Sequence, residues 1–401
     1  MIRFKKDDGS NYPNIVEDKM QNLSKINQGL QIAIENRFDK PGDGRYFYIT
    51  NEFLKEGANK RYYIENPPKS VICTKEDILM TRTGNTGLVV SNVDGCFHNN
   101  FFKIDYDRAR LNKDYLLNFF KRPETLHRIL VLAGASTIPD LNHKDFYSIK
   151  IPVPCLEEQQ KIADFLSTVD DVIAASEQEV AALEEQKKGA MQKIFSQEVR
   201  FKADDGSDYP EWEEKSVKEL TLFHKQGYYT KEEYVENGIK LARVSDLFNP
   251  KVDFESMPMI DISEKDYEAF KVSVGDFLIA RSGSIGRYGI VTEIPEDIKV
   301  VFGSFVIKFN FDENLLNTKY FGEFYSSDFA LRQLKRIIQA GANVNINAEN
   351  IKTIKVPLPC LKEQQKIANF LSDFDKAIDL AKQELEQWKE LKKGLLQQLF
   401  E

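Results

Sequence analysis

The sequence predicts a mixed α/β protein in which two globular domains alternate with two long helices that pair as an antiparallel coiled coil. The main observation is an internal repeat. "CLEEQQKIADFLS" at Cys155 returns as "CLKEQQKIANFLS" at Cys360, and "RFKKDDGSNYP" at Arg3 returns as "RFKADDGSDYP" at Arg200. The stretches between these matches repeat only weakly, so two similar units related by a pseudo-twofold repeat are expected. The predicted boundaries are 1–154 for the first globular domain, 155–198 for a central helical spacer, 199–359 for the second globular domain and 360–401 for a C-terminal helical spacer.

The two globular domains are predicted to be rich in strands. Short apolar or aromatic runs such as "RYFYIT" at Arg45, "DILMT" at Asp77 and "VFGSFVIKF" at Val300 are separated by Gly, Asn and Asp turns. This texture is typical of mixed α/β domains. A chain of 401 residues with 42% hydrophobic and 29% charged residues also fits a globular protein with more than one core.

Both spacers show the hydrophobic period of a coiled coil. Alternate steps of four and three residues from Ile162 and from Ile367 meet almost only apolar residues for nearly five heptads. An antiparallel pairing would bring Ile162 to Leu399, and Lys187 near Phe374. The alternative is that each helix packs only on its own globular domain. The residues expected at the seam are Ile162, Leu166, Ile173, Leu183, Ile194, Ile367, Leu371, Ile378, Trp388 and Leu399.

The sequence predicts no catalytic site and no metal site. The cysteines lack the CxxC spacing of a zinc site. "ENPPKS" at Glu65 resembles the Asn-Pro-Pro-aromatic motif of amino methyltransferases, but Lys69 replaces the aromatic residue, so a turn is favoured over a stand-alone adenine methyltransferase. The first residues are charged, and no run is long enough to span a bilayer, so we expect a cytoplasmic protein.

Polar loops supply candidates for nucleic-acid binding. "TRTGNTG" at Thr81 and "ARSGSIGR" at Ala280 each place arginine, hydroxyl residues and glycines after a strand. Arginine can bridge guanine O6 and N7, amide side chains read adenine, and hydroxyl groups hold phosphates. The alternative for Arg82 and Arg281 is that they brace their turns or pair with acids. The candidates in the first domain are Lys25, Gln28, Arg45, Arg82, Thr83, Asn85, Thr86, Ser136 and Thr137; those in the second are Lys225, Gln226, Lys240, Arg243, Arg281, Ser282, Ser284, Arg287, Asn343 and Asn345.

The net charge of −8 is unevenly distributed. The two spacers carry −6 and −1, which leaves −1 for the rest of the chain. Local basic faces are therefore compatible with the acidic total. The same acidic total supports a second hypothesis, a coiled-coil protein-interaction scaffold that does not bind DNA.

These features together resemble the specificity subunit of type I restriction-modification enzymes. The doubled "P.PCL.EQQKI" connector is the most specific part of a resemblance that covers essentially the whole chain. It implies a non-catalytic subunit whose two target recognition domains each read one half of a bipartite, asymmetric double-stranded DNA target. It also implies two methyltransferase subunits docked on the helices, with Lys187 and Lys392 among the contacts, and restriction/translocase subunits in the full complex. S-adenosylmethionine, ATP and Mg²⁺ are implied for those partners, and no cofactor is implied for this chain.

Overall fold

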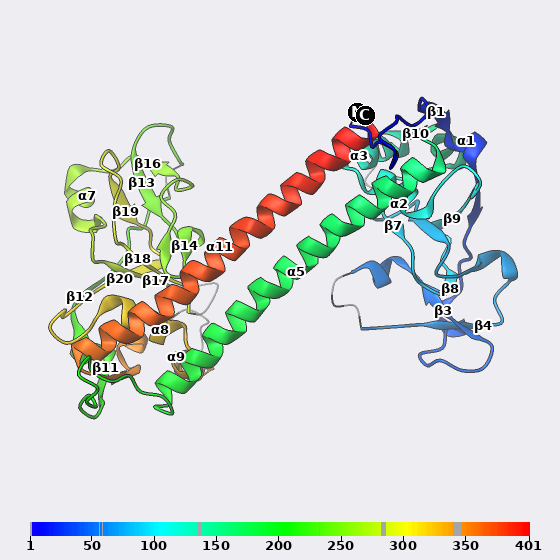
Figure 1. Ribbon diagram of the computed structural model, residues 1–401. Helices are drawn as coiled ribbons and strands as arrows, with labels where there is room; N and C mark the ends of the chain where they lie inside the picture. The colour runs from blue at the N-terminus through cyan, green and yellow to red at the C-terminus, as the bar shows by residue number, and fades with distance from the viewer. Residues whose placement is uncertain are drawn as a thin grey trace. The chain divides into compact units, whose positions relative to one another are not determined.

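The computed structural model describes residues 2–55, 57, 59–134, 138–231, 233–281, 286–339 and 346–401 (Figure 1). The chain divides into two compact units: unit 1 is Met1–Glu177 with Gln383–Glu401, and unit 2 is Gln178–Lys382. Each unit holds one globular part together with parts of both long helices, α5 (Leu156–Phe195) and α11 (Leu361–Phe400). This division cuts across both helices.

The globular part of unit 1 contains two sheets. One has the strand order β2-β9-β6-β7 and is antiparallel; the other has the order β4-β3-β8-β5, with β3 and β8 parallel. A separate antiparallel pair joins β1 to β10. The strands are β1 (Val16–Lys19), β2 (Ser24–Gln28), β3 (Arg45–Ile49), β4 (Tyr63–Glu65), β5 (Ile72–Cys73), β6 (Ile78–Thr81), β7 (Val89–Val90), β8 (Gly95–Phe97), β9 (Phe101–Tyr106) and β10 (Lys150–Val153).

Helices pack on the first of these sheets to form the main core of unit 1. Phe102 of β9 and Phe120 of α2 are fully buried in this core, as is Leu166 of α5. Both long helices contribute to it, since α11 supplies Leu399 and Phe400. The helices are α1 (Met20–Leu23), α2 (Lys113–Lys121), α3 (Pro123–Ala133) and α4 (His143–Ser148), with 3-10 turns at Ile34–Asn36, Asn51–Leu54 and Lys69–Val71.

Unit 2 repeats this topology. The antiparallel sheet has the order β12-β20-β17-β18, the sheet with a parallel pair has the order β16-β13-β19, and β11 pairs with β21. β14 and β15 form an additional hairpin. The strands are β11 (Glu213–Ser216), β12 (Thr221–Gln226), β13 (Ile239–Ala242), β14 (Leu247–Phe248), β15 (Lys251–Val252), β16 (Met259–Ile260), β17 (Phe277–Ala280), β18 (Tyr288–Ile290), β19 (Val300–Phe302), β20 (Val306–Phe311) and β21 (Lys355–Leu358).

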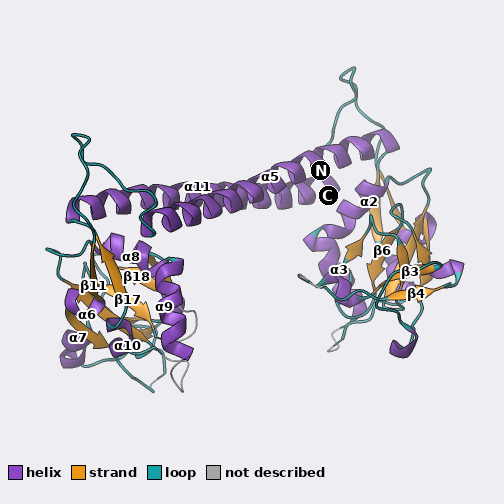
Figure 2. Cartoon of the chain, turned by 90° about the horizontal axis from the view of Figure 1, so that it is seen from below, coloured by secondary structure: helices purple, strands orange, loops and turns teal. Residues whose placement is uncertain are grey.

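The core of unit 2 is rich in aromatic residues. Phe277 stacks on Tyr288 with ring centroids 5.0 Å apart, and Phe321 of α8 packs edge-on to Phe277 at the same distance. Figure 2 shows helices lying against the strands within each unit. The helices of unit 2 are α6 (Val217–Leu220), α7 (Glu264–Phe270), α8 (Thr318–Ser326), α9 (Asp328–Gln339) and α10 (Ala348–Lys352), with a 3-10 turn at Val244–Asp246.

The long helices run antiparallel within each unit. In unit 1, Glu177 pairs with Lys389 and Asp170 with Lys392; in unit 2, Glu184 pairs with Lys382 and Lys187 with Asp375. Residue numbers rise along one helix as they fall along the other, which is the antiparallel direction expected from the pseudo-twofold repeat. Most predicted seam residues are buried: Ile162, Leu166, Ile194, Ile367, Leu371, Ile378 and Leu399. Ile173, Leu183 and Trp388 are half-buried. Over the described residues, no helix combines the length and hydrophobicity needed to cross a membrane.

Candidate nucleic-acid interface

Arg82 follows strand β6 and is held by an acid in its own unit. Its Nε and Nη2 donate to the two carboxylate oxygens of Asp140 at 2.9 and 2.6 Å. Thr83 donates to the same carboxylate at 2.7 Å. Hydrogen bonds from Arg82 hold the pKa of Asp140 below its ordinary value. The charge of Arg82 is thus already compensated, which is the structural role considered as the alternative.

Arg281 takes the equivalent backbone position in unit 2 but lacks this acid. Its carbonyl accepts from the N–H of Ile346 at 3.0 Å, as the carbonyl of Arg82 accepts from that of Leu141 at 2.9 Å. The residue before Leu141 is the aspartate that holds Arg82, whereas the residue before Ile346 is an asparagine. Among the described residues, the buried Nε of Arg281 has no hydrogen-bond partner. The two arginine loops therefore differ in net charge.

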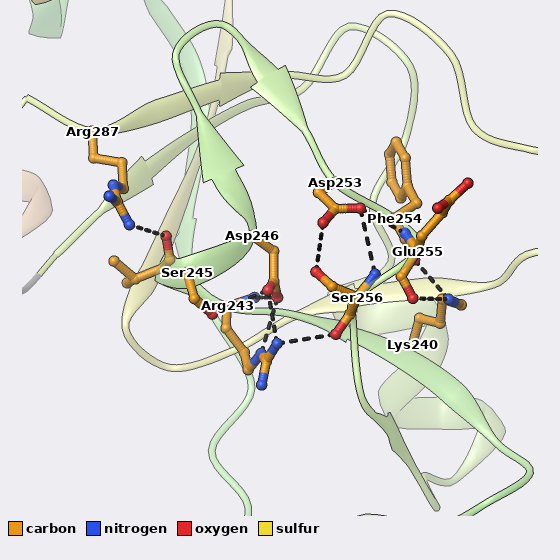
Figure 3. A network of polar contacts seen from close by, with 10 residues as sticks. Lys240, Arg243, Ser245, Asp246, Asp253, Phe254, Glu255, Ser256 and Arg287 are labelled. Carbon is orange, nitrogen blue, oxygen red and sulfur yellow. Dashed lines mark hydrogen bonds and ion pairs between the residues drawn. The ribbon is translucent and has the colours of Figure 1, made fainter. Parts of the chain in front are cut away.

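Arg243 and Lys240 belong to a polar network in unit 2 (Figure 3). The guanidinium of Arg243 forms two hydrogen bonds to the buried Asp246, at 3.0 and 2.8 Å, and a third to the carbonyl of Ser256. The ammonium group of Lys240 donates to the carbonyls of Phe254 and Glu255 at 2.6 and 3.1 Å. These contacts brace the loops around β14 and β15, and they orient the side chains without neutralising Lys240.

Two further basic candidates of unit 2 contact aromatic rings. The Lys225 ammonium lies 3.9 Å from the centroid of the Phe270 ring and donates to a backbone carbonyl at 2.7 Å. Arg287 donates to the carbonyl of Val244 at 3.2 Å, and its guanidinium lies 6.0 Å from the Phe248 ring centroid. Carbonyl and ring contacts leave the positive charge uncompensated, so both side chains stay attractive to phosphate.

Gln28 and Gln226 end the equivalent edge strands β2 and β12. Each is followed by a glycine, Gly29 or Gly227, at which a Cβ would lie 2.2 or 2.1 Å from a backbone carbonyl oxygen. Both glutamines are exposed, and each donates one weak hydrogen bond to a backbone carbonyl, at 3.3 and 3.4 Å. The repeated Gln-Gly step thus places an amide side chain at the same strand end in both units.

The remaining candidates of unit 1 are unevenly exposed. Lys25 on β2 and Asn85 in the arginine turn are exposed. Thr86 is buried and donates to the carbonyl of Pro139 at 2.7 Å, so it stabilises the loop. Arg45 lies over the Phe38 ring at 3.6 Å, with a Glu65 oxygen 3.5 Å from its Nε. Six candidates lie outside the described residues: Ser136, Thr137, Ser282, Ser284, Asn343 and Asn345.

A cavity of about 700 Å³ in unit 2 adds residues that the sequence reasoning missed. It is lined in part by Tyr234, Arg243, Ser245, Ser304 and Phe305. Tyr234 and Phe305 are more than half exposed. An exposed aromatic ring beside polar groups is suited to contact a sugar or base. The sequence does show these aromatic residues in its loops. They have no aromatic equivalents in unit 1, so the comparison of repeats did not identify them.

The repeated segments at Arg3–Pro13 and Arg200–Pro210, here called the leaders, contact the connectors at the start of each long helix, which the sequence did not predict. Arg3 forms two hydrogen bonds to Glu158 at the start of α5, at 3.0 and 2.6 Å. Arg200 binds Glu363 at the start of α11 in the same way, at 3.3 and 3.0 Å, and Trp212 donates to that carboxylate at 2.9 Å. Both glutamates are fully buried. Each leader is therefore anchored on a connector helix of its own unit.

The two glutamines after each glutamate also have internal partners. Gln159 is fully buried; it accepts from the backbone N–H of Asn112 at 2.8 Å and donates to two carbonyls. Gln160 accepts from the side-chain amide of Asn112 at 2.8 Å. Gln364 and Gln365 make the matching contacts with Asn317. These asparagines are the N-caps of α2 and α8. The repeated glutamines therefore attach each connector to the globular part of its own unit.

Lys187 lies between two carboxylates in unit 2. Its Nζ is 2.7 Å from Asp375 and 2.8 Å from the buried Glu323 of α8. Burial raises the pKa of Glu323 to about 7. Lys392 contacts Asp170 in unit 1. The lysines expected to contact a partner thus have internal partners, and the expectation of a partner contact at these two lysines stays a prediction.

The geometry defines a protein with two copies of one binding module, each anchored on a helix pair. Among the described residues, no group of three potential metal ligands is found. The chain belongs to the type I restriction modification DNA specificity domain family, whose model matches residues 19–185 and 209–390. Each match covers one of the two globular parts.

The relatives in this family are specificity subunits. The chain is 28% identical over 344 residues to the type I restriction enzyme MjaVIII specificity subunit of Methanocaldococcus jannaschii, covering 83% of this chain and 80% of the relative. It is 25% identical over 285 residues to the EcoBI specificity subunit of Escherichia coli, covering 66% and 59%. Specificity subunits are non-catalytic components of type I restriction-modification enzymes, and this chain has that DNA-specificity role.

Solved structures show the same fold. The S subunit of a type I restriction-modification system from M. genitalium superposes with a TM-score of 0.56 at 17% identity, covering 97% of this chain and 96% of that one. A chain from a structural study of complex assembly and conformational transition in the type I R-M system gives a TM-score of 0.61 at 14% identity, covering 96% and 97%.

Proposed function

We propose that this chain reads a bipartite, asymmetric double-stranded DNA target, with each globular part binding one half-site. The observation that carries the proposal is that the two modules share strand order but differ in loop chemistry. The arginine of the unit 1 loop, Arg82, binds Asp140, whereas the sequence of unit 2 has an asparagine at the position equivalent to Asp140. Modules alike in fold and different in contact residues are expected to read different bases.

Arg281 is the strongest base-contact candidate in this proposal. A guanidinium that already forms two bonds to a carboxylate must break them before it can bind guanine, and Arg82 and Arg243 are both in that state. Arg281 has no such acid among the described residues. Lys225, Lys240 and Arg287 keep uncompensated charge and suit phosphate contacts, which position the protein on the duplex.

The paired long helices are proposed to form a coiled coil and to carry two methyltransferase subunits. Support comes from apolar side chains that repeat on their surfaces. Leu156 and Phe165 of α5 are 40% and 38% exposed, and their equivalents Leu361 and Phe370 of α11 are 38% and 40% exposed. Equivalent exposed residues in both units suit two copies of one protein partner. S-adenosylmethionine, ATP and Mg²⁺ are assigned to the methyltransferase and restriction subunits.

Selection from a random pool of double-stranded DNA tests the reading of bases. The full chain with its methyltransferase partner should enrich two short, different half-sites at a fixed spacing. A protein-interaction scaffold without DNA binding would enrich no sequence. Two identical half-sites in inverted order would contradict the asymmetric target.

Binding of the methyltransferase tests the helix surface. Leu156→Ser combined with Leu361→Ser should weaken the complex while the chain stays folded, because both docking surfaces lose exposed apolar area. Leu380→Ser is the matched control, since Leu380 is 66% exposed on α11 and has an alanine at the equivalent position of α5. Equal affinity for the double variant and the control would place the docking surface elsewhere.

A further inference from the structure

Ion pairs beside the helix seam use opposite signs on the two helices. In unit 1, Glu177 of α5 lies 2.8 Å from Lys389 of α11. In unit 2, Glu184 of α5 lies 2.7 Å from Lys382 of α11. The side chains are about half exposed, between 43% and 53%. In both units the acid belongs to α5 and the base belongs to α11.

These four residues occupy two positions of the internal repeat. Moving 205 residues along the chain takes Glu177 to Lys382 and Glu184 to Lys389. Each connector begins with an identical "EQQKI", but the helices differ at many later positions. The charge also reverses from Glu157 to Lys362 and from Asp171 to Lys376, yet among the ion pairs of the described residues none joins these side chains to the other helix. The repeat therefore keeps the residues that anchor each helix to its own globular part, and it reverses the charge at the two positions whose side chains pair between α5 and α11.

A second set of ion pairs does not distinguish the helices. Asp170 pairs with Lys392 in unit 1, and Lys187 pairs with Asp375 in unit 2. Here the repeat conserves the charges, since Asp170 is equivalent to Asp375, and Lys187 to Lys392. These pairs would form equally well between α5 and α11 or between two copies of either helix.

The Glu–Lys positions, in contrast, would carry like charges if either helix paired with a second copy of itself, which is called self-pairing below. If α5 paired with α5 of a second chain in the same antiparallel register, Glu177 would face Glu184 of the second chain, twice per helix pair. If α11 paired with its own copy, Lys382 would face Lys389, again twice. Opposite charges beside a helix seam favour pairing, and like charges oppose it.

We infer that Glu177, Glu184, Lys382 and Lys389 form a charge code that makes α5 select α11 and reject a second copy of itself. The Asp–Lys pairs stabilise any antiparallel pairing, and the Glu–Lys pairs choose between the possible pairings. The choice matters for DNA recognition, in a step that rests on the proposed function. Self-pairing would place two identical modules about a twofold axis and change the target to an inverted repeat.

Two charge-neutral exchanges in the full chain test the code. Glu184→Lys with Lys389→Glu creates like-charge pairs between α5 and α11, and opposite-charge pairs in both self-pairings. This variant should form about ten times as much dimer as the native chain at the same concentration, because the preferred pairing is now between chains. Exchanging all four charges restores opposite pairs within the chain, and should return the dimer fraction to the native level. Sedimentation velocity measures both without DNA.

Thermal unfolding provides a second reading that does not require a dimer. Glu184→Lys alone places a second positive charge against Lys382, and should lower Tm by about 2 to 4 °C relative to Glu184→Lys with Lys382→Glu, in which the pair is restored. The difference should shrink in 1 M NaCl, where charges are screened within about 3 Å.

Equal Tm values for these two variants would overturn the inference, as would a native dimer fraction in the folded Glu184→Lys, Lys389→Glu variant. A dimer excess that persists in 1 M NaCl would also overturn it. None of these measurements involves DNA, so their failure would leave the proposed target recognition untouched.

Discussion

At the scale of single residues, one acid distinguishes the two arginine loops, and under the proposed function it leaves Arg281 as the candidate for a base contact. Arg82 and Arg281 stand in closely similar motifs, and both follow a buried strand with the same backbone hydrogen bonds. One aspartate separates their roles, because Asp140 binds Arg82 through both carboxylate oxygens. No local pattern could predict this, since the partner lies 58 positions away in the sequence.

Substitution of the two arginines should therefore have different effects. Arg281→Ala should weaken binding to one half-site, or relax its sequence, by roughly 1 to 3 kcal/mol while leaving Tm near native. Arg82→Ala should instead reduce stability by about 1 kcal/mol, since it removes a bidentate but partly exposed ion pair. Quantitative DNA binding and thermal unfolding of both variants check this. Equal loss on every DNA sequence for Arg281→Ala would assign it to phosphate, and an altered half-site for Arg82→Ala would contradict the division of roles.

Glu323 is a single residue that makes the stability of unit 2 depend on pH. Burial raises its pKa from 4.5 to about 7, beside Lys187 and Asp375. Between these two values the folded carboxyl group holds its proton longer than the unfolded one, so stability present below about pH 4.5 falls as pH rises toward 7. The equivalent residue of unit 1 is Asn118, which does not titrate.

Glu323→Gln should flatten this pH dependence. The glutamine keeps the shape of the neutral carboxyl group, so the variant should gain stability relative to native as pH rises from 4.5 to 7, by on the order of 2 kcal/mol. Urea unfolding across this pH range measures it. Asp373→Asn, on an exposed carboxylate of α11, is the control and should leave the native slope unchanged. A native slope in Glu323→Gln would exclude this group as the cause.

At the level of elements, the periodic patterns predicted more than the loops did. The repeated connectors begin one residue before the observed helix starts, Leu156 and Leu361, and the seam pattern lies within both helices. The runs at Arg45, Asp77 and Val300 are strands, as predicted. From the sequence, the similarity of the two connectors was attributed to equivalent partner subunits. In the structure, the glutamate and glutamines of each connector bind the leader and the globular part of the same unit. A periodic pattern predicts which face of a helix or strand is buried. It does not identify partners that lie more than 40 positions away in the sequence, as these do.

The attachment of each leader to its helix should be strongly stabilising. Arg200→Ala leaves the carboxylate of Glu363 buried with Trp212 as its remaining side-chain donor, which should cost about 2 to 3 kcal/mol in the free energy of unfolding. Lys202→Ala is the control: its side chain is 64% exposed, and its loss should cost under about 0.5 kcal/mol. Urea unfolding of the full chain compares the two. Similar losses would show that the buried pair is not a main anchor.

For the whole molecule, the paired helices are proposed to set the distance between half-sites. Seven residues inserted between Glu177 and Gln178, and seven between Lys382 and Gln383, leave each compact unit intact. The insertions keep the heptad stripe and add about 10 Å, or roughly three base pairs. DNA selection with this variant should return the same half-sites with a longer gap. An unchanged gap, or new half-sites, would contradict a role as a spacer.

A half-length chain shows how the internal repeat and the charge code act together. A fragment of residues 1–197 keeps the first module and α5 but loses Leu396, Leu399 and Phe400, which complete the core of unit 1. A second copy could replace them with Met191, Ile194 and Phe195, the equivalent residues of α5. The resulting twofold dimer would present two identical modules, so with the methyltransferase partner it should direct methylation to a palindrome of the first half-site.

The charge code predicts that this native fragment dimerises weakly, because Glu177 faces Glu184 of the second copy twice. Glu184→Lys turns both contacts into opposite-charge pairs. If each exposed pair contributes roughly 0.5 kcal/mol in either direction, the two contacts together gain about 2 kcal/mol, and the dimer should tighten about thirtyfold at low salt. Glu185→Lys adds the same charge at the next residue, which is exposed and has no ion pair among those found in the described residues, and serves as the matched control. Sedimentation equilibrium gives both dissociation constants, and methylation mapping gives the target. Equal tightening by the two lysines would reduce the effect to net charge, and methylation of the asymmetric full-length target by the fragment would exclude the twofold dimer.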